Sequence, residues 1–173
     1  MSTKSAIEIL NDLGLWAYSP DFDGFESSGA LRDLGNPVSV VVLISNFDTQ
    51  IDINGIVDFL GNSSGLFARE TVDALKLINC LGDAEVLSRI IDIAEEAGMT
   101  HKAVQLDLAP LEPFTVGTFS DFHGDKWNLA CDLIQALRDG IDQQRIREAL
   151  QCFIETNRPA LEAALEHYQV KSS

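Results

Sequence analysis

Apolar residues recur along most of the chain with the period of about 3.6 residues that is typical of an α-helix. In residues 5–18, Ile7, Leu10 and Leu13 share one face, which predicts a first helix that buries this face. The same spacing predicts helices over residues 67–79, 84–97, 125–138, 142–155 and 158–169, with a shorter helical segment over 53–61. The pattern therefore favours a helical protein from residue 66 onward.

Capping residues mark the start of several of these helices. Asp83 is a suitable cap for the helix over 84–97, and Asp142 and Asn157 are suitable caps for the last two helices. Residues 100–124 show little periodicity and contain several Pro and Gly residues, so we expect a long surface connection there.

Residues 38–44, with the sequence VSVVVLI, allow two interpretations. Their β-branched content favours a buried strand. Asn36 as a cap and Pro37 as the first helical residue favour a buried helix instead. Local propensity leaves both interpretations open.

The length and composition predict one globular domain. The chain has 173 residues, of which 46% are apolar and 23% charged, so it has enough apolar surface for a core. No internal repeat, low-complexity tract or linker divides it. We therefore expect residues 1–173 to form a single domain.

The charge balance is strongly acidic. Twelve Lys and Arg face 27 Asp and Glu, which gives a formal net charge of −15. Such a chain is repelled by nucleic acid and by anionic membranes, so its expected partner is a cationic protein surface, a cation, or a surface that normally binds phosphate. The alternative is a solvated acidic face that keeps the protein soluble.

The excess of acid is concentrated in residues 33–100, which hold eleven acidic and three basic residues. Self-repulsion weakens a compact fold, so folding alone gives no reason for this concentration. We expect this part of the surface to bind the basic partner, through Asp48, Asp52, Asp58, Glu70 and Asp73.

The three cysteines, Cys80, Cys131 and Cys152, lie far apart, and no pair has metal-ligand or redox spacing. Their odd number suits a reducing compartment. No secretory signal and no apolar run of membrane-spanning length occurs in the sequence, so we expect a cytoplasmic protein.

Two segments carry weak signals for chemistry. Gly61–Gly65 fits the G-x-S-x-G pattern of hydrolases with Ser63 as nucleophile, but short motifs often match by chance, and a polar turn in which Ser63 or Ser64 caps the next helix is the favoured interpretation. Asp121, His123 and Asp125 place three potential metal ligands in one segment, but Asp is also common in turns. No phosphate-binding or dinucleotide-binding motif is present, so we expect no cofactor.

Residues 51–80 carry a more specific pattern. The run INGIVDFLGNSSG at 53–65, followed by ETVDAL at 70–75, resembles the bacterial DNA-mimic protein family with its N-G-G…F-F-x-N-S-S-G signature. The segment CFIETNRP at 152–159 is similar to that family's closing segment. The chain departs from the signature at Ile56, where a second Gly is usual, and at Asp58, Phe59 and Leu60.

This resemblance implies an all-α protein without catalytic activity, in which an acidic dimer occupies the DNA-binding surface of a transcription factor. The motif residues are expected to turn the chain between two packed helices; they are Asn54, Gly55, Asn62, Ser63, Ser64 and Gly65. Combined with the periodicity, the resemblance predicts a single-domain bundle of six to eight helices.

Three functions are compatible with these observations. The first is a non-catalytic protein that presents carboxylates to a basic partner as DNA presents phosphates. The second is an immunity or antitoxin-like protein that neutralises a basic toxin. The third is a small hydrolase that uses Ser63, or a metal enzyme that uses the Asp121–Asp125 segment.

Overall fold

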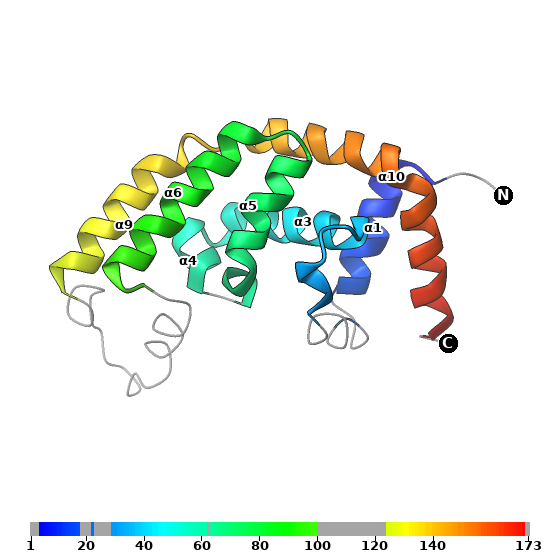
Figure 1. The fold of residues 1–173 in the computed structure, drawn as a ribbon, viewed down its shortest axis with the longest axis horizontal. Helices are drawn as coiled ribbons and strands as arrows, with labels where there is room; N and C mark the ends of the chain where they lie inside the picture. Colours follow the sequence, from blue (N-terminus) through cyan, green and yellow to red (C-terminus); the bar gives the residue numbers. More distant parts are fainter. Residues whose placement is uncertain (1–3, 18–21, 23–28, 62, 100–123, 172–173) are drawn as a thin grey trace.

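The computed structural model describes residues 4–17, 22, 29–61, 63–99 and 124–171, and these form a single all-α domain (Figure 1). The described residues contain seven α-helices and two 3-10 helices and no strand. The α-helices are α1 (Ala6–Ala17), α3 (Pro37–Ile53), α4 (Ile56–Gly61), α5 (Ala68–Leu77), α6 (Leu81–Ala97), α9 (Asp125–Arg138) and α10 (Gln143–Lys171). The 3-10 helices are η1 (Ala30–Arg32) and η2 (Ser63–Phe67). The prediction of an all-α bundle of six to eight helices is confirmed.

Helix α3 lies at the centre of the fold, and residues 38–44 are therefore helical. The side chain of Asn36 accepts a hydrogen bond from the N–H of Val38 at 3.0 Å, and Pro37 opens the first turn. All seven residues from Val38 to Ile44 are buried, because α1, α5 and α10 all pack against this helix. The strand interpretation is wrong because burial on every side of a helix produces the same continuous apolar run.

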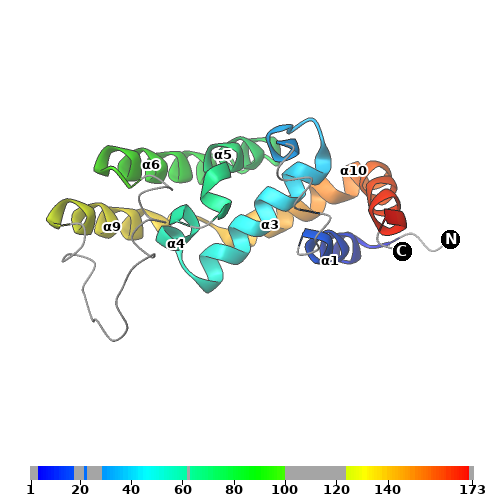
Figure 2. The same ribbon diagram turned by 90° about the horizontal axis from the view of Figure 1, so that it is seen from below.

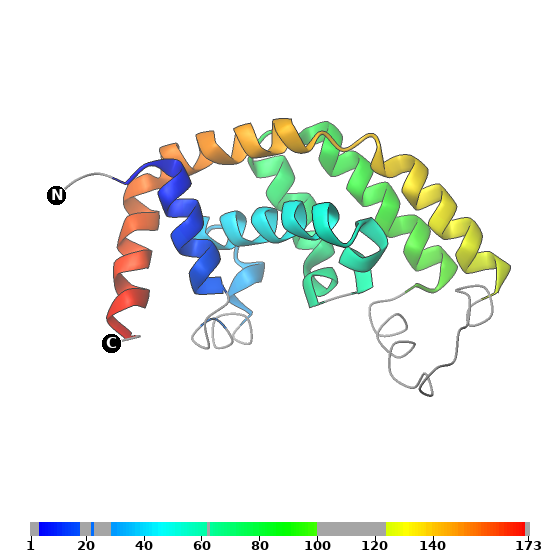
Figure 3. The same ribbon diagram turned by 180° about the vertical axis from the view of Figure 1, so that it is seen from behind.

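The helices form two groups joined by α3 and α10. Helices α6 and α9 pack side by side at one end, with α5 against α6, and α1 packs at the other end (Figure 2). Helix α10 runs along one side of the molecule from the α9 end to α1, as Figure 3 shows from behind.

The first helix buries a different face from the predicted one. Ile9, Leu13 and Trp16 enter the core, whereas the side chain of Ile7 is 58% exposed. Leu10 is only partly buried. The prediction that Ile7 and Leu10 share the buried face with Leu13 is therefore wrong.

Asp83 does not cap α6, as the sequence predicted, because α6 begins two residues earlier at Leu81. Its carboxylate is fully buried and joins α6 to the start of α10. Oδ1 accepts a hydrogen bond from the N–H of Asp142 at 2.8 Å, and Oδ2 accepts two from the guanidinium of Arg145. The segment before α10 is thereby fixed against α6.

The two predicted C-terminal helices are one. Helix α10 continues through Pro159 and is bent near its middle (Figure 1). Asn157 is not a cap, because it donates a hydrogen bond to the carbonyl of Phe153 within the helix. The predicted cap at Asp142 is confirmed, since its carboxylate accepts a bond from the N–H of Arg145 at 3.0 Å.

The predicted surface connection at 100–124 lies outside the described residues, apart from Gly124. Among the helices of the described part, none has both the length and the apolar character needed to cross a membrane.

Candidate functional site

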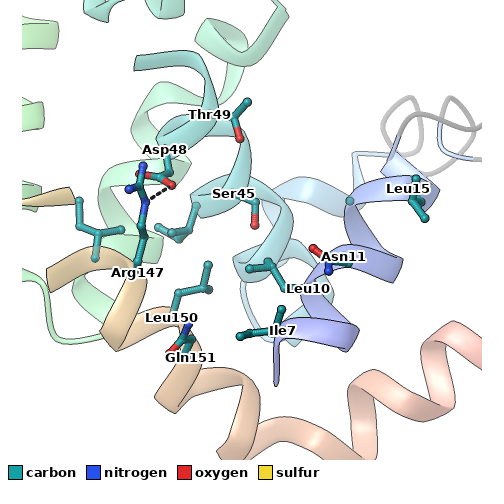
Figure 4. Close-up of a pocket in the computed structure, with 13 residues that line it drawn as sticks. Ile7, Leu10, Asn11, Leu15, Ser45, Asp48, Thr49, Arg147, Leu150 and Gln151 are labelled. Atoms are coloured by element: carbon teal, nitrogen blue, oxygen red, sulfur yellow. Dashed lines mark hydrogen bonds and ion pairs between the residues drawn. The ribbon is translucent and has the colours of Figure 1, made fainter. Parts of the chain in front are cut away.

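An open groove of about 820 Å³ lies between α1, α3 and α10 (Figure 4). Most of its lining is apolar, and all three helices contribute to it. The apolar side chains are Ile7, Leu10 and Leu15 from α1, Ile44 from α3, and Ile146 and Leu150 from α10. Figure 4 shows Ile7, Leu10 and Leu150 converging between the helices. Ile7 and Leu10, which the sequence pattern assigned to the buried face of the first helix, line this groove instead.

A group of charged and amide side chains closes one end of the groove. Nε of Arg147 on α10 donates to Asp48 on α3 at 2.7 Å, and another guanidinium nitrogen donates to Asp52 one turn further along α3. The side-chain amide of Gln143 also reaches both carboxylates, at 3.0 and 2.6 Å. These contacts hold α10 against α3 in the register that shapes the groove.

The charges in this group stabilise one another. The hydrogen bond from Gln143, followed by Arg147, lowers the pKa of Asp52. The hydrogen bond to Asp48 raises the pKa of Arg147. One of the two negative charges on α3 is thus neutralised within the chain.

The other predicted partner-binding residues lie on α4 and α5. Glu70 pairs with Arg32, and Asp73 pairs with Lys76 at 2.8 Å. Asp58 is exposed and forms no ion pair with any residue that the structure describes. Four of the five predicted carboxylates are therefore engaged by cations of the same chain. Their role in partner binding stays a prediction.

Sequence reasoning missed a row of unpaired carboxylates on α9. Asp125, Asp132 and Asp139 follow one another at seven-residue spacing, which is nearly two helical turns. All three are exposed, and Asp132 points about 200° away from the fully buried Ile134. The seven-residue spacing is readable in the sequence, but the larger excess of acid in residues 33–100 pointed to a different part of the surface.

The cations of α9 do not neutralise this row. Lys126 donates to the backbone carbonyl of Glu96 at 2.7 Å, and Arg138 donates to the side-chain oxygen of Gln143 at 2.7 Å. Within the described ranges, the three aspartates make no ion pair. We call these three residues the α9 row.

The motif region turns the chain between helices, as its residues led us to expect. Gly55 has a φ of 88° at the end of α3, a backbone conformation that favours glycine. A Cβ on Gly65 would lie 2.2 Å from the carbonyl oxygen of Leu60, so this position requires glycine. Asn54 donates its side-chain amide to Gln50 at 2.8 Å.

The arrangement around Ser63 does not match a hydrolase elbow. That elbow requires a strand before the serine, whereas helix α4 precedes Ser63 here. Ser63 is exposed and Ser64 half-buried, both in η2, and Asn62 lies outside the described residues. A hydrolase also needs an acid and a histidine later in the chain. Asp107 and His123 follow in that order and likewise lie outside the described residues.

The possible metal site can be followed only in part. Asp121 and His123 are outside the described residues, and Asp125 is exposed at the start of α9. No group of three His, Cys, Asp or Glu side chains that could hold a metal occurs among the residues that the structure places.

The family model of the DMP19-like protein matches residues 32–157, well over half of the chain. The chain belongs to the DMP19-like protein family. The DMP19-like match extends from η1 into α10, so it includes the α9 row and two of the three walls of the groove. No curated protein and no solved structure shows significant similarity to the chain.

This match corrects the family assignment made from residues 51–80. The matching family is described as DMP19-like protein, and the assignment to the DNA-mimic family is withdrawn. The motif at residues 53–65 specifies how the chain turns, because Gly55 and Gly65 meet the backbone requirements of the connection from α3 through α4 to η2. Those requirements carry no information about a partner.

Proposed function

We propose that this protein is a non-catalytic binding protein that presents carboxylates to the basic surface of a partner protein and competes there with nucleic acid. The α9 row carries this proposal. Asp125, Asp132 and Asp139 are exposed negative charges that form no ion pair with a described cation. A partner with Lys and Arg side chains would neutralise them, as it would neutralise phosphates.

The paired carboxylates contribute less to such binding. Arg147 already offsets one of the two charges at Asp48 and Asp52, and a partner would have to displace that guanidinium to use both. Exposed carboxylates without an ion-pair partner are more available to a cationic surface, and their attraction acts within the screening length of about 8–10 Å.

We also propose a reducing, cytoplasmic location. The three cysteines are free, and burial raises the pKa of the Cys80 thiol and of the Cys131 thiol. Thiols of this kind act as small apolar side chains and do not require an oxidising compartment.

The test is release of proteins from immobilised double-stranded DNA. Proteins of the source organism's lysate are loaded on the DNA, and the protein is added at low and at high salt. We expect wild type to release a specific basic protein at low salt only. If wild type releases none at either salt concentration, the proposal is wrong.

Two triple variants with the same change in charge locate the binding surface. In the first, Asp125, Asp132 and Asp139 become Asn; in the second, Asp58, Glu70 and Asp73 become the corresponding amides. We expect at least tenfold less release by the first variant and nearly wild-type release by the second. Circular dichroism verifies folding, and the reverse order of effects would place the surface on α4 and α5.

A further inference from the structure

The groove between α1, α3 and α10 exposes apolar surface that the described fold does not cover. The side chains of Ile7 and Leu15 are 58% and 74% exposed, although both lie along the groove. Single exposed apolar residues are ordinary on protein surfaces, but here they border a groove that the partly buried Leu10 and the buried Ile44, Ile146 and Leu150 also line. This combination indicates an interaction surface.

The α1 side of the groove is long enough to contact several turns of a helix. The residues of α1 that line the groove recur at the three- and four-residue spacing of one helical face, from Ile7 through Leu10 to Gly14. Helix α1 has twelve residues, which corresponds to a wall about 18 Å long. At Gly14 an added Cβ would meet no atom within 4 Å, so this wall borders open space.

The charges around the groove determine which charge on a bound molecule would be attracted to it. Arg147 is shared by Asp48 and Asp52, and Lys4 pairs with Asp12 at 2.6 Å. Glu8, next to Ile7, is exposed and accepts hydrogen bonds from Ser5, which lower its pKa. The surroundings of the groove therefore carry more negative than positive charge.

We propose that this groove binds an amphipathic helix of a partner protein, with the apolar face of the helix between α1 and α10 and its Lys or Arg side chains towards the acidic rim. In helix-in-groove recognition, the bound helix places apolar anchors at i, i+3 or i+4, and i+7 in an apolar groove. Helix α1 makes its main contacts with α3 and α10, so the α1 side of this surface lies apart from the α9 row. The proposal therefore stands independently of the proposed function.

The experiment measures binding of a fluorescent 18-residue peptide of Leu and Lys, ordered so that a helix has one apolar face. A peptide of the same composition in scrambled order has the same charge but no apolar face. The protein carries Asn at Asp125, Asp132 and Asp139, so that attraction to the α9 row does not contribute. We expect the ordered peptide to bind at least tenfold more tightly than the scrambled one.

Filling the groove provides the decisive variant. Gly14→Leu extends an isobutyl group into the open space, and Gly14→Ala is the matched control because it changes the same position without filling the groove. We expect Gly14→Leu to weaken binding of the ordered peptide at least tenfold, and Gly14→Ala to retain it. Leu15→Lys should also weaken binding, whereas Leu81→Lys, at an exposed leucine on α6, should not.

Each alternative outcome overturns the proposal. Equal affinity for both peptides, unaffected by Gly14→Leu, would mean that charge alone attracts them. A protein that sediments as a dimer, and becomes a monomer with Gly14→Leu, would place a second copy of this chain in the groove. If a neutral peptide of Leu and Gln bound as tightly as the ordered Leu and Lys peptide, the bound helix would not need basic side chains. The DNA-release test is unaffected by any of these results.

Discussion

The fully buried carboxylate of Asp83 accepts two hydrogen bonds from Arg145, at 3.0 and 2.7 Å, across 62 residues of sequence. This pair ties the first turn of α6 to the first turn of α10. The guanidinium is half exposed, and the carboxylate raises its pKa. The buried charge is thus compensated by a cation that remains partly hydrated.

Arg145→Met should destabilise the protein by about 3 kcal/mol, because it leaves the Asp83 carboxylate buried without its cation. Urea unfolding measures the loss. Arg158→Met is the control, since Arg158 pairs with the exposed Glu155 and should cost less than about 1 kcal/mol. An equal loss of unfolding free energy in the two variants would show that the buried ion pair stabilises the fold no more than an exposed one.

Gly65→Ala should destabilise the protein by about 1–3 kcal/mol, because the added Cβ would meet the carbonyl oxygen of Leu60 at 2.2 Å. Gly14→Ala is the opposite case. It adds a methyl group in open space on α1 and should stabilise the protein by about 1 kcal/mol. Thermal unfolding of both variants checks the two signs, and a stabilising Gly65→Ala would contradict the close contact.

Asp52→Asn should make stability less dependent on pH in the acidic range. Its contacts with Gln143 and Arg147 lower the pKa of Asp52 in the folded protein. The carboxylate therefore stabilises the fold above the unfolded pKa of about 3.9, and this contribution disappears as the pH falls through the folded pKa.

The difference in unfolding free energy between wild type and Asp52→Asn measures this effect. It should be largest at neutral pH and shrink below about pH 4. Asp58→Asn controls for loss of one negative charge at a site without a described ion pair. A difference that stays constant from pH 7 to pH 2 would argue against ionic stabilisation by Asp52.

Asn36→Ala should cost about 1 kcal/mol, because it removes the acceptor for the N–H of Val38 at the start of the central helix. Asn36→Asp preserves the acceptor and should cost much less. Comparable losses for Ala and Asp would show that the cap bond does not stabilise α3.

The sequence predicted the helices that have one side in water, because their apolar and polar residues alternate with the helical period. Helices α5 and α9 occur within one or two residues of the expected ranges. Residues 38–44 could not be assigned locally, since α3 is covered on several sides by elements distant in sequence. Asn157 as a cap predicted a helix boundary before residue 158, but the surrounding packing maintains α10 through Pro159.

The groove was harder to predict than the helices. Ile7 and Leu10 look like core residues because a groove wall and a core face have the same period. The pairing of Asp48 with Arg147 joins residues 99 positions apart, which only the packing of α10 on α3 determines. The excess of acid was readable from composition, but which carboxylates are left unpaired was not.

The contact of α1 with α10 also has a consequence for biosynthesis. These helices lie at opposite ends of the described chain, and both help to form the groove. A ribosome releases α1 long before α10, so Ile9, Leu13 and Trp16 have no complete packing site while synthesis continues. Closure of the native core is therefore a late event, and α1 is the segment that a chaperone would find exposed on the nascent chain.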